Sequence, residues 1–198
     1  MIASLALLAL SASAPAVVVA DARDADWRRA ATPADRARLR GWRSAWMAAL
    51  TDARATGDGA AAIARDGGLF DPDRSLEQPL PPSGDYRCRT VKLGRRGAVG
   101  LGYVAYPWFR CWVGERGEFV RLDGSQRQVG RFFADTDARA VFLGTLALGD
   151  ERSPIAYARD PQRDLAGVVE RIGERRWRIA FPFPAFESKL DVVEVVPG

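Results

Sequence analysis

The sequence predicts a mainly β protein, an antiparallel barrel of about eight strands that is preceded by an amphipathic helix. Three observations support this fold class. Apolar and polar residues alternate with a period of two in many short stretches after residue 84. Glycine or proline separates most of these stretches, and no long helical segment interrupts them. A β-sandwich would show the same pattern and is the alternative architecture.

The first 22 residues have the features of a secretory signal peptide. An apolar run passes into a stretch of small residues, and cleavage is expected after Ala20 or Ala22. Serine and proline residues break the run, which is therefore too short to span a membrane. We expect an exported protein, periplasmic or secreted, from which residues 1–22 are removed.

A helix is predicted to start at Pro33. Thr32 is a capping residue, proline suits the first helical position, and Asp35 places a carboxylate near the free amides. Apolar residues then recur at steps of three and four. The stripe that they form consists of Leu39, Trp42, Trp46, Ala49, Leu50 and Ala53. We expect this face to pack on the rest of the protein.

The glycines at 57–59 are expected to end this helix, and a short second helix is expected at 60–65, stopped by Gly67 and Gly68. Proline residues then indicate an extended linker. The predicted organisation is therefore a helical segment and linker over 23–83, followed by the barrel over 84–198.

Strands are predicted wherever the alternation is uninterrupted. They are expected near 86–93, 101–113, 118–123, 126–133, 140–148, 154–158, 165–172, 175–181 and 190–196. The hairpin around Gly173 is the clearest, because glycine permits the positive φ of a tight turn and both arms alternate. A lipocalin-like barrel of this size is either filled with side chains or holds one small ligand.

Cys88 and Cys111 are the two cysteines, and each lies in a predicted strand. Cysteines of an exported chain are normally oxidised. A disulfide that closes a loop of about 24 residues stabilises a protein by roughly 3 kcal/mol. We expect a structural disulfide, since redox or metal chemistry would require a closer Cys-x-x-Cys spacing or further ligands.

The composition excludes several function classes. The chain has no histidine, which removes histidine-dependent catalytic triads and the usual histidine metal sites. Arginine supplies nearly all of the basic residues, since Lys92 and Lys189 are the only lysines, and acids are interspersed among the arginines. Nucleic-acid binding is therefore not expected. Neither a cofactor nor a metal ion is predicted, and no catalytic residue is assigned.

Several segments together resemble one bacterial family. They read GDYRCRT at 84–90, YVAYPWFRC at 103–111, GSQR at 124–127, FLGTLALGDE at 142–151 and ESKLD at 187–191. In these segments the chain is similar to the domain-of-unknown-function family 4893 over roughly residues 30–197. The resemblance implies an exported envelope protein of Gram-negative bacteria, and it implies no particular activity.

A candidate ligand site is predicted from the densest aromatic stretch and the turn that follows the next strand. Rings with a few polar groups are typical of small-molecule sites, and the forked guanidinium of arginine suits a carboxylate or phosphate. The proposed ligand-binding residues are Tyr106, Trp108, Arg110, Gln126 and Arg127. Replacing Arg127 by alanine is expected to weaken ligand binding without unfolding the protein.

Three functional hypotheses follow. The first is an exported, monomeric binding module for a small apolar, lipid or anionic ligand. The second is a carboxylate-based hydrolase that acts on envelope material, for which Asp150, Glu151, Glu170, Glu187 and Asp191 are available, although ion pairing with arginine is the expected role of these groups. The third is a structural protein that binds an envelope protein partner.

Structural criteria separate these hypotheses. Two partly buried carboxylates that face one cleft, one of them with a raised pKa, would favour the enzyme. A hydrophobic cavity that lacks them would favour the binding module. A filled barrel with an exposed apolar patch would favour the protein partner.

Overall fold

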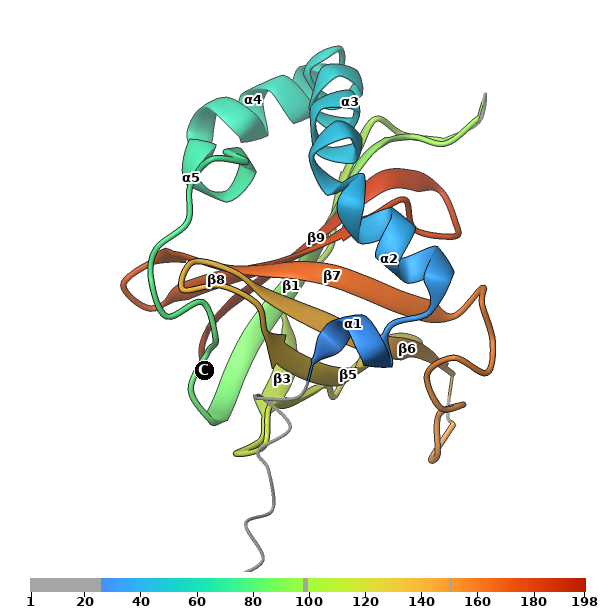
Figure 1. Cartoon of the computed structure of the whole chain (residues 1–198). Helices are drawn as coiled ribbons and strands as arrows, with labels where there is room; N and C mark the ends of the chain where they lie inside the picture. The colour runs from blue at the N-terminus through green and yellow to red at the C-terminus, as the bar shows by residue number, and fades with distance from the viewer. Residues whose placement is uncertain (1–25, 98–99, 150) are drawn as a thin grey trace, which may run out of the picture.

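The protein is a closed antiparallel β-barrel with helices on its outside (Figure 1). Its structure is a computed structural model that describes residues 26–97, 100–149 and 151–198. The strands are β1 (Gly84–Arg95), β2 (Tyr103–Ala105), β3 (Phe109–Val113), β4 (Glu118–Arg121), β5 (Gln126–Ala134), β6 (Ala140–Leu148), β7 (Asp164–Gly173), β8 (Arg176–Pro182) and β9 (Ser188–Pro197). All except β2 form the ring in chain order, and β9 closes it by pairing with β1. The predicted barrel of about eight strands is confirmed. The predicted signal peptide lies outside the described residues.

Two predicted strands differ from the observed ones. The stretch 101–113 is divided into β2 and β3, because Pro107 lacks the amide hydrogen that a continuous ladder requires. The stretch 154–158 is a loop between β6 and β7, not a strand. Within it the Tyr157 hydroxyl donates to Asp35 at 2.5 Å and accepts from the amide of Thr32, so this apolar-looking segment anchors the helices instead.

The helical segment is more divided than predicted. It contains α1 (Trp27–Ala30), α2 (Pro33–Arg40), α3 (Trp42–Arg54), α4 (Gly57–Arg65) and α5 (Gly67–Phe70). Thr32 caps α2 as expected, through a bond from the amide of Asp35 at 3.1 Å. The single helix expected after Pro33 is interrupted at Gly41, where a Cβ atom would lie 3.0 Å from the Phe183 ring.

The glycines expected to end helices begin them instead. Gly57 and Gly67 are the first residues of α4 and α5, and each follows a side-chain cap. Thr56 accepts from the amide of Gly59 at 3.1 Å, and Asp66 accepts from the amide of Leu69 at 3.3 Å. A capping side chain just before a glycine therefore outweighs the breaking tendency of the glycine.

The helices cover one side of the outer barrel surface (Figure 1). The apolar stripe of α3 is buried there against outward-facing residues of β1, β8 and β9, as the amphipathic pattern predicts. This outer core includes Trp46, Ala49, Leu50, Ala53, Val91, Leu93, Ala180, Leu190 and Val192. Beneath it Arg178 of β8 is fully buried, and its guanidinium lies 4.5 Å from the Trp46 ring.

Inside the barrel, one half is filled with apolar side chains. This inner core includes Tyr86, Val113, Phe119, Phe132, Phe142, Val169, Trp177, Ile179, Val193 and Val195. The predicted disulfide between Cys88 and Cys111 is confirmed and lies in this core, where it joins β1 to β3 with the Cα atoms 6.0 Å apart. The two cysteines occupy diagonal positions, since Cys88 pairs with Phe109 and Cys111 with Tyr86.

The hairpin of β7 and β8 is present, with a local irregularity near its end. The register shifts between Arg171 and Gly173, and Gly173 pairs with Arg176. Gly173 does not adopt a positive φ, so the turn forms without the conformation that was expected of it. Among the described residues, no helix has the length and apolar character needed to cross a membrane.

Candidate ligand cavity in the barrel

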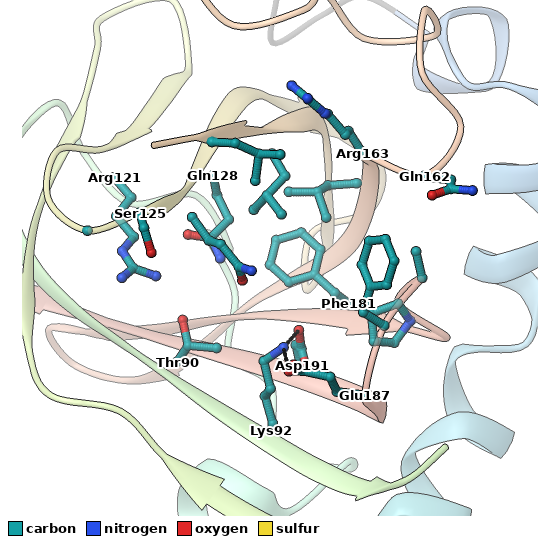
Figure 2. Close-up of a pocket in the computed structure, with 18 of the residues that line it drawn as sticks. Thr90, Lys92, Arg121, Ser125, Gln128, Gln162, Arg163, Phe181, Glu187 and Asp191 are labelled. Atoms are coloured by element: carbon teal, nitrogen blue, oxygen red, sulfur yellow. Dashed lines mark hydrogen bonds and ion pairs between the residues drawn. The ribbon is translucent and has the colours of Figure 1, made fainter. Parts of the chain in front are cut away.

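The other half of the barrel interior holds a cavity of about 900 Å³ that is open at one end (Figure 2). This end is formed by the β4–β5 turn, the loop before β7 and the loop between β8 and β9. Apolar walls come from Phe109, Leu146, Leu148, Leu165, Phe181 and Phe186, and polar groups come from Thr90, Lys92, Arg121, Gln128 and Asp191, among others. The cavity therefore combines an apolar surface with a few polar groups, the usual composition of small-molecule sites.

The hollow arises from a change of residue type along the inward faces of the strands. In β1 the buried alternate positions Tyr86 and Cys88 belong to the filled core, whereas Thr90 and Lys92 line the cavity. In β5 the same change occurs from Phe132 to Gln128. Since side chains alternate between the two faces of a strand, these short or polar residues leave this half of the barrel interior unfilled.

Aromatic rings separate the cavity from the filled core. Phe181 lines the cavity and packs edge-on against Phe142, with ring centroids 5.5 Å apart. Phe142 in turn contacts Phe119 and Phe132. Gly144 leaves room for the Phe142 ring, because a Cβ atom there would lie 2.6 Å from it. These packed rings give the cavity a closed apolar floor.

Arg121 is the most buried cation of the cavity, with 7% of its surface exposed. Its Nε donates to the backbone carbonyl of Asp123 at 2.9 Å, and its guanidinium lies 3.5 Å from the centre of the Phe109 ring. The Asp123 carboxylate is instead bound by Arg110, at 3.0 Å and 3.1 Å. Burial lowers the pKa of Arg121 from its ordinary value. In the described part of the chain, Arg121 forms no salt bridge.

Two further polar side chains of the cavity are buried without a hydrogen-bond partner among the described residues. They are Thr90, through its Oγ1, and Gln128, through its Oε1. Thr90 is 4% exposed and Gln128 is 7% exposed. Buried polar atoms are usually hydrogen-bonded, and these two atoms are available to a ligand that enters the cavity.

Lys92 forms a cluster with two carboxylates on a different wall from Arg121 (Figure 2). Its Nζ lies 2.7 Å from Glu187 Oε2 and 3.8 Å from Asp191 Oδ2. Ser188 donates a short hydrogen bond to Asp191. Burial raises the pKa of Asp191 to about 6, although Lys92 opposes the shift. The positive charge of Lys92 is thus compensated within the protein.

The cavity contains two of the five predicted ligand-binding residues. Tyr106 and Gln126 line it. Trp108 does not, since it lies against the guanidinium groups of Arg87 and Arg89, which are 5.1 Å and 4.9 Å from its ring.

Arg110 and Arg127 do not line the cavity either. Arg110 is paired with Asp123, and Arg127 donates to the backbone carbonyls of Gly124, Gly149 and Glu151. The structural reason is the strand period, because Phe109 and Gln126 face inward and their neighbours face outward. The most buried cation that lines the cavity is Arg121, which sequence reasoning missed although it follows the apolar residue Phe119 at a spacing of two.

The acidic residues considered for catalysis differ in the cations with which they pair. Glu170 pairs with Arg178 at 2.6 Å and Glu151 pairs with Arg163 at 2.8 Å, which agrees with the expected ion pairing with arginine. Glu187 and Asp191 instead share Lys92 and face the cavity. Asp150 lies outside the described residues. Within the described ranges, no group of three or more cysteine, aspartate or glutamate residues is placed to hold a metal ion.

The fold and the cavity define a class, a small closed β-barrel that is filled at one end and hollow at the other. Within this class the chain belongs to the family described as Domain of unknown function (DUF4893), whose family model matches residues 27–195. The resemblance found from the sequence is thereby confirmed. No curated protein and no solved structure matches the chain significantly.

Proposed function

We propose that this protein is an exported, monomeric binding module that holds one small amphipathic molecule in the hollow half of its barrel. The observation that carries the proposal is the cavity of about 900 Å³, with an apolar floor and buried polar atoms that lack partners. This volume lies within the range of pockets that enclose small ligands. The apolar walls would hold a hydrocarbon portion, and the unpartnered polar atoms would bind a head group.

Export is the second part of the proposal. It is supported by the features of a signal peptide in residues 1–22 and by the disulfide between Cys88 and Cys111. A carrier outside the cytoplasm would protect an apolar molecule from water while the molecule crosses an aqueous compartment. A filled barrel would favour the third hypothesis, a protein partner, whereas one half of this barrel is hollow.

The test uses Nile red, a neutral dye whose fluorescence rises in apolar surroundings, with the protein purified from the periplasm. We expect the dye to bind the wild-type protein, and Leu146→Trp, which fills the cavity, to weaken binding about tenfold or more. Leu122→Trp is the matched control, because Leu122 is 44% exposed and does not line the cavity. Equal dye binding by both variants would contradict the proposal, provided that both unfold at the wild-type temperature.

A carboxylate-based hydrolase is a second candidate, because its structural criterion is met in part. Glu187 and Asp191 face the same cavity and share Lys92, and burial raises the pKa of Asp191 to about 6, but the Glu187 side chain is 64% exposed and not partly buried as the criterion requires. A carboxyl group with such a pKa is suited to act as a general acid near neutral pH. The second carboxylate would then stabilise the developing charge or activate water.

Peptidoglycan digestion tests this candidate. We expect wild-type protein to release soluble fragments at a rate that falls as the pH rises above about 6, and Asp191→Asn to lower the rate about 100-fold. Asp73→Asn, at an exposed salt bridge with Arg43, is the control. A wild-type protein that releases no fragments by mass spectrometry would leave the binding module as the function.

A further inference from the structure

We propose that Arg121 is the binding site for a carboxylate head group, and that the ligand of this barrel is an aliphatic carboxylic acid. This inference rests on the proposed binding function and names its ligand class. Arg121 is nearly excluded from solvent, lines the cavity and has no carboxylate partner in the described part of the chain. A buried charge is costly unless it is paired, so an anion supplied by the ligand would complete the site.

The protein positions the Arg121 guanidinium for this role. Its Nε is bound to the carbonyl of Asp123, and Phe109 lies against the plane of the group at 3.5 Å. Among the described residues, the Arg121 side chain donates one hydrogen bond, and this bond is from Nε and not from the two terminal nitrogens. These nitrogens are suited to the paired oxygens of a carboxylate.

The turn after β4 brings the chain close to this guanidinium. Gly124 has a φ of 94°, and a Cβ atom there would lie 2.6 Å from Arg121 Nη2. Only glycine therefore combines this backbone conformation with room for the arginine. Ser125, next in the turn, also lines the cavity on the same side as Arg121 (Figure 2).

Other cations of the cavity are already neutralised. Lys92 is compensated by Glu187 and Asp191. Arg163 is paired with Glu151 at 2.8 Å and with Asp160 at 3.4 Å. Arg121 therefore differs from both, because Asp123, the acidic residue that acts on its charge, binds Arg110 instead, and an anionic group on the ligand would supply the salt-bridge partner that Arg121 does not have among the described residues.

The unpartnered atoms of Thr90 and Gln128 refine the ligand class. The Oε1 atom of Gln128 accepts hydrogen bonds, and the Thr90 hydroxyl both donates and accepts. In Figure 2, Gln128 of β5 lies near Arg121, and Thr90 of β1 lies below both of them. A hydroxyl group close to the carboxylate would supply the donor that Gln128 lacks. The best-matched ligand is therefore a hydroxylated aliphatic acid, with its chain along Leu146, Leu148 and Phe181.

Competition with Nile red tests this inference at pH 8, where carboxylic acids are ionised. The competitors are dodecanol, dodecanoic acid and 3-hydroxydodecanoic acid, which have the same chain length. We expect dodecanoic acid to displace the dye at a concentration about tenfold below that of dodecanol, and the hydroxy acid to act at a lower concentration still. Arg121→Gln should abolish the preference for acid over alcohol and leave dye binding in place.

Arg131→Gln is the matched control, because Arg131 is an arginine outside the cavity that pairs with Glu118 at 3.4 Å, and it should retain the wild-type preference. If Arg121→Gln fails to fold, Arg121→Lys keeps the charge and should retain a reduced preference. Equal competition by acid and alcohol in the wild-type protein would reject the anion site while the binding module stands. If the dye does not bind and no competitor is retained in native mass spectrometry, both proposals fail.

Discussion

Two arginines that are almost excluded from solvent lie on opposite faces of the barrel wall. Arg178, on the outer face, is 0% exposed and is bound by the Glu170 carboxylate at 2.6 Å and by the backbone carbonyls of Leu69 and Arg74. Arg121, on the inner face, is 7% exposed and is bound by one backbone carbonyl. Each lies against an aromatic ring, and burial lowers the pKa of each.

The difference shows that the partners of a buried arginine indicate whether it stabilises the fold or binds a ligand. Arg178 connects β8 to β7 and to the segment that includes α5, so its partners hold the helices on the barrel. Arg121 connects few elements, and its terminal nitrogens face the cavity. A buried arginine whose donors are all used stabilises the fold, whereas one with free donors in a hollow points to a ligand.

We expect the largest loss of stability when Arg178 is deprived of its carboxylate partner Glu170. Glu170→Gln leaves Arg178 buried without its counter-charge, and it also removes the salt bridge from Glu170 to Arg139 at 2.9 Å. We expect the free energy of unfolding in urea to fall by about 3 to 5 kcal/mol. Asp73→Asn, at an exposed pair, should leave the unfolding midpoint almost unchanged. A Glu170→Gln protein as stable as the wild type would show that the buried pair does not hold the helices.

A smaller effect concerns Asp191, whose partner Lys92 is a compensated cation of the cavity. The pKa of Asp191 is about 6 in the folded protein and about 4 in the unfolded chain. The folded state therefore binds more protons between these pH values, and this group lowers the free energy of unfolding as the pH rises from 4 to 6, on the order of 3 kcal/mol in total.

Asp191→Asn removes this titration. The free energy of unfolding of the variant minus that of the wild type should therefore rise from pH 4 to pH 7. Urea unfolding of both proteins at each pH measures this difference. The other carboxyl groups are present in both proteins, so their contributions cancel in the difference. A difference that stays constant across this pH range would mean that the pKa of Asp191 is not raised in the folded state.

We expect the smallest change in stability when Arg121 itself is replaced. Arg121→Gln removes a buried charge that forms no salt bridge among the described residues, so the lost hydrogen bond to Asp123 and the lost contact with Phe109 are offset by the removal of the desolvation cost. We expect the free energy of unfolding without ligand to change by about 1 kcal/mol or less. A loss as large as that of Glu170→Gln would assign Arg121 a structural role and remove the basis of the comparison.

Much of the fold could be predicted because its signals are local. The alternation around Cys88 and Cys111 placed both in neighbouring strands, and the disulfide follows from that placement. Thr32 marked the start of α2 by its capping chemistry. The errors arose where a distant contact decided the structure. Gly41 separates two helices close to the Phe183 ring, and Tyr157 lies in a loop because its hydroxyl binds Asp35 and Thr32.

The site was less predictable than the fold. The strand period alone would have placed Arg110 and Arg127 outside and Arg121 inside, because Phe119 and Arg121 share a face. The prediction of Arg127 rests on a guanidinium beside a turn, and this description fits many exposed arginines equally well. Thr90 and Gln128 carry no sequence signal of function, since their significance lies in partners that they lack.

Local sequence patterns are enough to predict alternating antiparallel strands with an amphipathic helical segment before them, because side-chain direction along a strand or helix depends on the nearest residues. The hollow half of the interior, and the buried arginine that forms no salt bridge among the described residues, become visible once the strands are assembled. A cavity is what remains after eight strands have contributed their side chains. The pairing of Arg178 and the isolation of Arg121 depend in the same way on residues far apart in the chain.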